Sequence, residues 1–168
     1  QRPWFLLLLA CILLLAPIAA AQPRPAQAAT FEIAGPPGSE AFGQTVRILP
    51  NGNLVVSDTK YDLLGPIRDV GAVYLYDGAT LAQLSMLTGS TAGDQVGSYG
   101  VTVLANGNYV VSSPDWDNGP ATDAGAATWG SATTGVGGVV NPANSLVGST
   151  SGDRVGSGGE ITFVSVYT

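Results

Sequence analysis

Four side chains with oxygen donors lie close together between Ser113 and Gly125, in the segment of the sequence best suited to chemistry. The segment reads SPDWDNGPATDAG. Carboxylate and amide oxygens are the ligands that Ca²⁺ prefers in proteins. A weak calcium site is one interpretation, and a solvated loop whose aspartates make turns is the other. The candidate ligands are Asp115, Asp117, Asn118 and Asp123.

Two observations weaken the calcium interpretation. An EF-hand loop needs a further carboxylate at its twelfth position, and this segment does not match that spacing. The sequence is also internally repeated, as described below, and the first copy has Lys60 where the second has Asp115. A lysine at a ligand position would repel a cation. We expect no cofactor other than this candidate calcium.

Residues for catalysis are scarce. The chain has no histidine and a single cysteine, Cys11, which lies in an apolar N-terminal run. This excludes a Ser-His-Asp triad, a Cys-His pair and a histidine-bearing zinc site within the chain. Asp115 and Asp117 form a close carboxylate pair that could act as general acid and base. We expect a protein without catalytic activity; the alternative is a secreted propeller hydrolase or lyase in which carboxylates from several repeats converge.

Two aromatic residues, Tyr61 and Trp116, occupy equivalent positions in the two copies of the repeat. An exposed aromatic ring can stack on a sugar or contact a partner protein. The alternative is that both rings pack between neighbouring repeats, because the rest of each copy is rich in Gly, Ala and Val and needs bulky side chains to fill its core. The sequence leaves both interpretations open.

The N-terminal residues have the pattern of a secretory signal peptide. Arg2 precedes an apolar run at residues 4–15, and small residues follow at 19–21. Pro17 interrupts the apolar stretch, which is shorter than the roughly 20 residues of a membrane span. We predict a signal-peptide helix over residues 1–21 that is cleaved and leaves no stable membrane span, with retention as an anchor as the alternative. The protein is expected to be secreted or at the cell surface.

Acidic residues outnumber basic ones, with twelve Asp and Glu against six Lys and Arg. Nucleic-acid binding needs clustered Lys and Arg to neutralise phosphates, so we expect no nucleic-acid partner. Charged residues make up only 11% of the chain, and glycine, serine, threonine and valine are abundant. This composition favours short strands and tight turns over amphipathic helices. The predicted fold class is all-β.

The sequence repeats itself. VRILPNGNLVVS begins at Val46, and VTVLANGNYVVS begins at Val101. Each copy has two apolar runs around Asn51-Gly52 or Asn106-Gly107, and Asn-Gly between such runs is the strongest short-range signal for a hairpin with a two-residue type I′ turn. A second hairpin follows, with Asp77-Gly78 as its turn in the first copy and a longer, Gly-rich connection in the second. Each repeat is therefore predicted to contain four strands.

Nearly identical segments close the two repeats: GSTAGDQVGS begins at Gly89, and GSTSGDRVGS begins at Gly148. Their Ser, Thr and Asp side chains suit turn-making hydrogen bonds to the backbone, and their glycines suit positive φ angles. We interpret each segment as a junction that ends one four-stranded unit and leads into the next. A unit of this size matches a propeller blade.

The predicted organisation is a partial β-propeller of four-stranded blades. Residues 22–41 form a Pro/Ala-rich linker with a leading strand, 42–95 the first blade, 96–154 the second, and 155–168 the truncated start of a third. A closed propeller needs about four to eight blades. Either the chain is a fragment, which is the favoured interpretation, or several copies assemble.

These repeats resemble the FG-GAP repeats of integrin α-subunit propellers and of bacterial secreted and surface proteins. VVSSP, ending at Pro114, is similar to the Gly-Ala-Pro segment of that family, and GAVYLYDG from Gly71 looks like the strand that follows. The Phe-Gly that opens such a repeat corresponds to Phe42-Gly43, Val96-Gly97 and Val155-Gly156.

The resemblance implies a propeller that acts in interaction or adhesion at the cell surface or in the extracellular matrix, with an extracellular protein or carbohydrate as partner. One departure concerns calcium. Many members of the family carry an Asp/Asn-rich calcium loop between the Phe-Gly and Gly-Ala-Pro segments, where this sequence has only LPNGNL and LANGNY. Such short turns cannot supply the roughly six to eight oxygens that Ca²⁺ requires, so the family's calcium role is not carried over.

Overall fold

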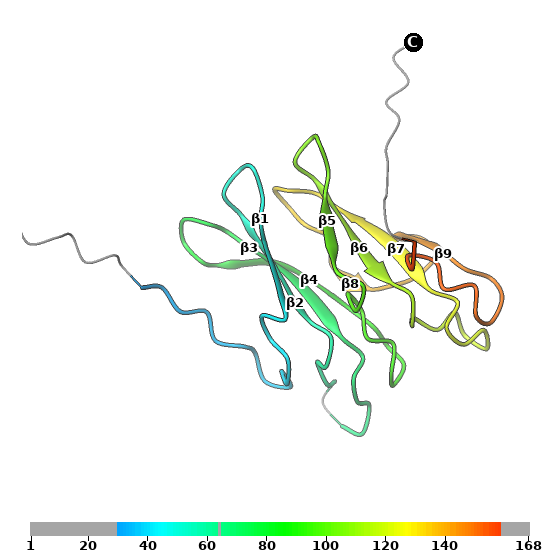
Figure 1. Ribbon diagram of the computed structural model, residues 1–168. Helices are drawn as coiled ribbons and strands as arrows, with labels where there is room; N and C mark the ends of the chain where they lie inside the picture. The colour runs from blue at the N-terminus through cyan, green and yellow to red at the C-terminus, as the bar shows by residue number, and fades with distance from the viewer. Residues whose placement is uncertain (1–29, 64, 159–168) are drawn as a thin grey trace, which may run out of the picture. The chain divides into compact units, whose positions relative to one another are not determined.

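The computed structural model describes residues 30–63 and 65–158 (Figure 1). The predicted signal-peptide helix, the first part of the predicted linker and residues 159–168 lie outside the described residues. In the described part, all regular secondary structure is β-strand, which confirms the all-β prediction. No helix in this part is long and apolar enough to span a membrane.

Two sheets make up the second of the chain's two compact units, residues 33–168. The strands of the first sheet form an antiparallel meander in chain order: β1 (Thr45–Ile48), β2 (Leu54–Asp58), β3 (Ala72–Tyr76) and β4 (Gln83–Thr88). The second sheet repeats this meander with β5 (Val101–Val103), β6 (Tyr109–Ser113), β7 (Ala126–Gly130) and β9 (Ser145–Val147). Each repeat thus contributes four strands to one meander, as its sequence predicts.

The turn between β1 and β2 is not the predicted type I′. Of the pair Asn51-Gly52, only Gly52 has a positive φ, at 90°. The N–H of Gly52 donates to the carbonyl of Leu49, and the N–H of Leu49 donates to the carbonyl of Asn53, both at 2.8 Å. This is a three-residue loop, a type I turn followed by a glycine bulge. Pro50 favours it, because its fixed φ of about −65° suits the second position of a type I turn. Asn106-Gly107 makes the same turn in the second repeat.

The connection between β7 and β9 leaves its own sheet. It carries a short strand, β8 (Gly138–Val139), which pairs in parallel with β4 of the first sheet. Because an edge strand otherwise presents unpaired backbone groups, β8 shields part of the first sheet's edge. The sequence predicts only a long connection here, since a strand of two residues leaves no pattern of alternation.

The central strands are buried on both faces. Every residue of β3 (AVYLY) and β6 (YVVSS) is buried, whereas β1 at the sheet edge is mostly exposed. Side chains from facing sides of the two sheets form one core, with Leu75 and Leu87 from the first sheet and Tyr109 and Val111 from the second. The sheets pack on each other through this core without closing into a ring.

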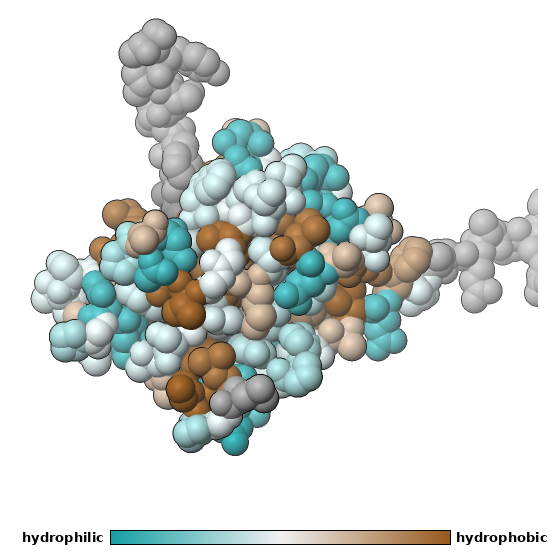
Figure 2. All heavy atoms as spheres, turned by 180° about the vertical axis from the view of Figure 1, so that it is seen from behind, coloured by the Kyte–Doolittle hydropathy of each residue, from teal (hydrophilic) through white to brown (hydrophobic). Residues whose placement is uncertain are grey.

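The other face of the first sheet carries a second apolar cluster around Tyr74 and Tyr76. Phe42 lies edge-on to both rings, with centroids 5.6 and 6.3 Å away, and Ile33 also packs here. The segment that precedes β1 therefore covers part of this face. On the side of the molecule seen in Figure 2, apolar residues form separate areas among polar ones.

Candidate functional site at the repeat junctions

Two junction segments, residues 89–98 and 148–157, fold into the same loop. In the first, the Asp94 carboxylate accepts hydrogen bonds from the backbone N–H groups four and three residues before it, both at 2.8 Å. In the second, Asp153 does the same at 3.0 and 2.9 Å. The predicted turn-making role is confirmed for the two aspartate side chains.

Each junction brings the chain back against a glycine of the preceding repeat. A Cβ built on Gly71 would lie 2.2 Å from the nitrogen of Val96, and one built on Gly125 would lie 2.3 Å from that of Val155. Both glycines also have positive φ, at 73° and 77°. No other residue fits there without moving the backbone, which explains the shared glycine of DVGA and DAGA.

Asp94 is the most buried carboxylate of the junctions, with none of its surface exposed. Besides its own loop, it accepts a hydrogen bond from the N–H of Asp117 at 3.1 Å. Burial raises the pKa of Asp94; the hydrogen bonds from its loop and from Asp117 oppose this, and the negative charge of Asp117 adds to the rise. The side chain thus ties the first junction to the second repeat.

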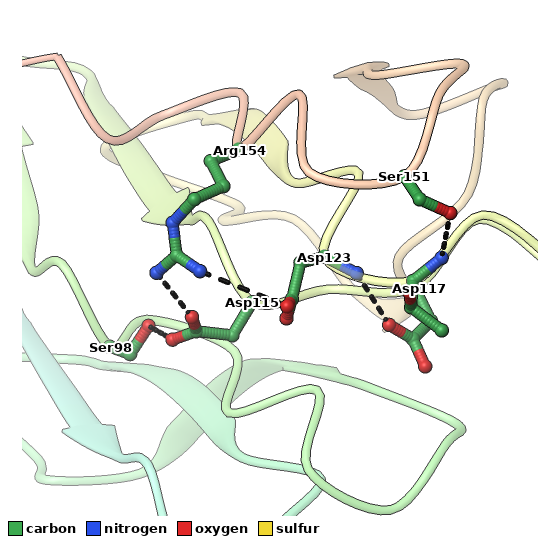
Figure 3. A network of polar contacts seen from close by, with 7 residues as sticks. Ser98, Asp115, Asp117, Asp123, Ser151 and Arg154 are labelled. Atoms are coloured by element: carbon green, nitrogen blue, oxygen red, sulfur yellow. Dashed lines mark hydrogen bonds and ion pairs between the residues drawn. The ribbon is translucent and has the colours of Figure 1, made fainter.

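Asp115 forms an ion pair with Arg154 of the second junction (Figure 3). Its Oδ1 lies 2.6 Å from a guanidinium nitrogen of Arg154, and its Oδ2 accepts a hydrogen bond from Ser98 at 2.9 Å. Arg154 also lies 3.9 Å from the carboxylate of Asp123. A protein cation therefore occupies the position between two of the four predicted calcium ligands.

The other two predicted ligands make different contacts. Oδ1 of Asp117 accepts a hydrogen bond from the N–H of Asp123 at 2.8 Å, and the side-chain amide of Asn118 donates to the carbonyl of Gly148 at 2.8 Å. Within residues 30–63 and 65–158, no group of three or more His, Cys, Asp or Glu residues is arranged to hold a metal ion. The segment between Ser113 and Gly125 is therefore a loop fixed by turns and an ion pair.

The same polar contact recurs in the first repeat. Oδ1 of Asp62 accepts a hydrogen bond from the N–H of Asp69 at 2.7 Å, as Asp117 does from Asp123. The N–H of Asp69 and the guanidinium of Arg68, 2.6 Å from Oδ2, hold the pKa of Asp62 below its usual value, against the effect of burial. Alignment of the two repeats matches Asp62 with Asp117 and Asp69 with Asp123, and it would have indicated that the contact occurs in both.

Two stretches of the chain, residues 48–98 and 103–157, match a family described as a repeat of unknown function (DUF5650). Together they cover more than half of the chain. The chain belongs to the DUF5650 repeat family. Curated proteins and solved structures give no match.

The DUF5650 matches end just past the junction glycines, at Ser98 and Ser157. The family's unit therefore includes the junction loop that follows the fourth strand of each repeat. This agrees with the geometry, because the junction residues Val96 and Val155 pair with the repeat that they leave.

Tyr61 and Trp116, the aromatic residues predicted to bind a partner, are wholly or partly buried in the two DUF5650 units. Trp116 is 4% exposed and packs in the core between the sheets. Tyr61 is half-buried and lies edge-on to Tyr74, with ring centroids 6.4 Å apart. The structure thus favours the packing alternative for both residues, since cores poor in bulky side chains need these rings.

Other large apolar side chains are exposed, and the sequence analysis did not select them. Tyr99, in the loop before β5, is 57% exposed; Trp129 on β7 and Leu146 on β9 are also exposed. The signal for the last two was available: alignment of the DUF5650 units puts Trp129 over Leu75 and Leu146 over Leu87. Nothing in the spacing of Tyr99 marks it out.

Proposed function

We propose that the chain is an exported, non-catalytic repeat protein that acts as an interaction or adhesion module at the cell surface or outside the cell. In this proposal its two sheets are blades of a partial β-propeller related to the FG-GAP repeats, and its partner is an extracellular protein or carbohydrate. The observation that carries the proposal is the exposed aromatic ring of Tyr99 beside the polar junction network.

The propeller part is supported by the repeated architecture. Each repeat is one four-stranded antiparallel meander, and the two meanders pack face to face through a shared core. Blades of a propeller have this strand number and this kind of contact with their neighbours. The signal-peptide pattern at residues 1–21 supports export.

A non-catalytic role is supported by how the carboxylates are used. A general acid or base needs a carboxyl group that substrate can reach and whose pKa suits proton transfer. Asp94 has a raised pKa but no exposed surface, and Asp115 is engaged by Arg154 and Ser98. These acids hold loops in place.

Tyr99 supports a binding role. Ser98, the residue before it in the sequence, donates a hydrogen bond to Asp115, which pairs with Arg154. The exposed ring of Tyr99 is therefore next in the chain to a residue of this polar network. Aromatic faces beside hydrogen-bonding groups suit both sugar rings and protein partners. The equivalent residue of the first repeat is Gln44, so this surface belongs to the second repeat alone.

Binding to an array of immobilised glycans and extracellular matrix proteins tests the proposal. We expect saturable binding of the full chain to at least one surface, weakened about tenfold by Tyr99→Ala, as for an aromatic residue central to an interface. Tyr61→Ala, at a half-buried ring, is the matched control. Undiminished binding by the Tyr99 variant would exclude this site, and absence of binding to every surface would count against an adhesive role.

Export and catalysis are tested separately. Protease added to intact cells should degrade an epitope-tagged chain if it is at the surface, and the tag should otherwise be found in the medium; a protected tag inside the cell contradicts export. The hydrolase or lyase alternative predicts release of soluble products from a bound polysaccharide and their loss with Asp115→Asn or Asp117→Asn. We expect no release.

A further inference from the structure

The two sheets of the chain pack front on back. The back face of the first sheet bears Val55, Val73, Leu75 and Leu87, and the front face of the second sheet bears Val101, Tyr109, Val111 and Ala126. These eight side chains belong to one core. The contact is heterologous, since each sheet uses a different face.

The back face of the second sheet reproduces the back face of the first. In the first sheet, Val55 pairs with Leu75 and Val73 pairs with Leu87 across the strands. The corresponding cross-strand pairs of the second sheet are Val110 with Trp129 and Ala127 with Leu146. All four remain apolar.

Burial of these equivalent positions differs. Leu75 and Leu87 are 0% exposed beneath the second sheet, whereas Trp129 is 50% and Leu146 is 72% exposed. Large apolar side chains that share an exposed sheet face indicate an interaction surface.

The first repeat has exposed apolar side chains on its front face, on strand β1. Val101 of the second repeat is 5% exposed, but its equivalent Val46 is 49% exposed, and Ile48 on the same strand is 72% exposed. A Cβ built on Gly97 would lie 2.7 Å from the side chain of Val73, while one built on the equivalent Gly43 would meet nothing within 4 Å. At strand β1, the front face of the first repeat therefore lacks the neighbour that the second repeat has, whereas Phe42 and Ile33 already cover the middle of that face.

We propose that a second copy of the chain fills this surface: the front face of its first repeat, with Val46 and Ile48, packs on Trp129 and Leu146 of the first copy. Each copy carries both halves of the contact, and the new interface continues the one already present between the sheets. Head-to-tail contacts of this kind close into rings or extend into filaments. A ring of about four to eight blades corresponds to two to four copies.

This assembly extends the proposed function and does not depend on it, because Tyr99 lies outside both faces in the loop before β5. Sedimentation velocity of the purified full chain over a wide concentration range tests the assembly. Trp129→Asp alters the back face only, and Ile48→Asp alters the front face only. Ala79→Asp is the matched control, since it adds the same charge at an exposed position in the loop between β3 and β4. All proteins keep residues 1–29 unchanged, so any association through that segment is common to the set.

We expect the wild type and Ala79→Asp to assemble as concentration rises, and each single face variant to lose self-association by about tenfold or more. An equimolar mixture of Trp129→Asp and Ile48→Asp should form a heterodimer that grows no further, because one copy keeps an intact front face and the other an intact back face. Circular dichroism checks folding, and Leu146→Asp and Val46→Asp provide second variants of the two faces.

Two results would overturn the proposal. A wild type that stays monomeric at every concentration leaves the face to a different occupant, such as a further repeat. Assembly that survives both face substitutions, or a mixture of the two variants that remains monomeric, would mean that copies do not meet front on back.

Discussion

Leu87 in the first repeat and Leu146 in the second occupy the same place in the same strand, two residues before the junction glycine. The first is fully buried and the second is 72% exposed. Both leucines lie opposite an apolar residue of the neighbouring strand, Val73 and Ala127, although β9 is shorter than β4 and lacks a strand such as β8 on its other side. What also differs is that another sheet lies against Leu87. The contrast shows that, in this chain, packing between repeats decides burial.

Burial on the front faces of the two sheets also depends on what packs against them. Phe42 and Ile33 cover the middle of the first repeat's front face, around Tyr74 and Tyr76, but they leave Val46 and Ile48 in solvent. The leading segment therefore covers only part of this face. Trp129 and Leu146 have no such cover among the described residues, and both are exposed.

The largest expected effect comes from comparing the two back faces by truncation. Leu75→Ala should cost about 2–5 kcal/mol of unfolding free energy, the range for a fully buried leucine. Trp129→Ala should cost less than about 1 kcal/mol in the monomer, because half of the side chain is already in water. Urea unfolding at a concentration too low for assembly measures both. Equal losses would mean that the second back face is already packed.

The two junction aspartates offer a second comparison. Asp94→Ala would remove a fully buried carboxylate and leave three backbone N–H groups without their acceptor, and we expect a loss of about 1–3 kcal/mol. Asp153→Ala frees two N–H groups that water can reach, so its loss should be smaller, about 0.5–1 kcal/mol. The same urea experiment decides. A larger loss at Asp153 would contradict the view that burial sets the importance of the junction.

The fold could largely be predicted from the sequence because its signals are local. Asn-Gly pairs between apolar runs located the first hairpins, and the duplicated GSTxGDxVGS located the junctions. The turn type was missed in both repeats: Pro50 favours a type I turn with a glycine bulge in the first, but Ala105 stands at that position in the second, which makes the same turn. Strand β8 was missed because its pairing with β4 joins residues far apart in the chain, and no local pattern records such a contact.

The candidate site was harder to predict, because polar residues close in sequence need not point to a common centre. Asp115, Asp117, Asn118 and Asp123 lie within one loop, yet their side chains contact Arg154, a backbone N–H and a carbonyl of the second junction. For Trp116 the sequence left open whether the ring is exposed or packed, and the structure places it in the core. These directions come from packing between repeats.

Acidification should separate two aspartates with opposite pKa shifts. The pKa of Asp62 is lowered, so its stabilising contribution is present above about pH 4, the unfolded value, and is lost as pH falls through the folded pKa. The pKa of Asp94 is raised, so its contribution is most favourable below about pH 4 and is lost as pH rises through the folded pKa.

Urea unfolding of the wild type, Asp62→Asn and Asp94→Asn at a series of acidic to neutral pH values measures this difference. The gap in stability between wild type and Asp62→Asn should shrink on acidification, while that between wild type and Asp94→Asn should move in favour of the wild type. Parallel profiles for the two variants would show that neither group is perturbed in the folded state.

Added calcium is expected to have the smallest effect on stability. The calcium experiment compares the loop around Asp115 with the equivalent loop around Lys60 in the first repeat. Arg154 lies between Asp115 and Asp123, and the first repeat has Lys60 at the position of Asp115, so a cation of the protein stands at or near the candidate site in both.

A ligand that binds only the folded chain raises its melting temperature. Thermal melts in calcium and in chelator should therefore coincide for the wild type. Arg154→Ala removes the competing charge, and a calcium-dependent rise confined to that variant would show that the ion pair keeps metal out of the loop. A rise of several degrees in the wild type itself would instead establish the calcium site and refute the ion-pair interpretation.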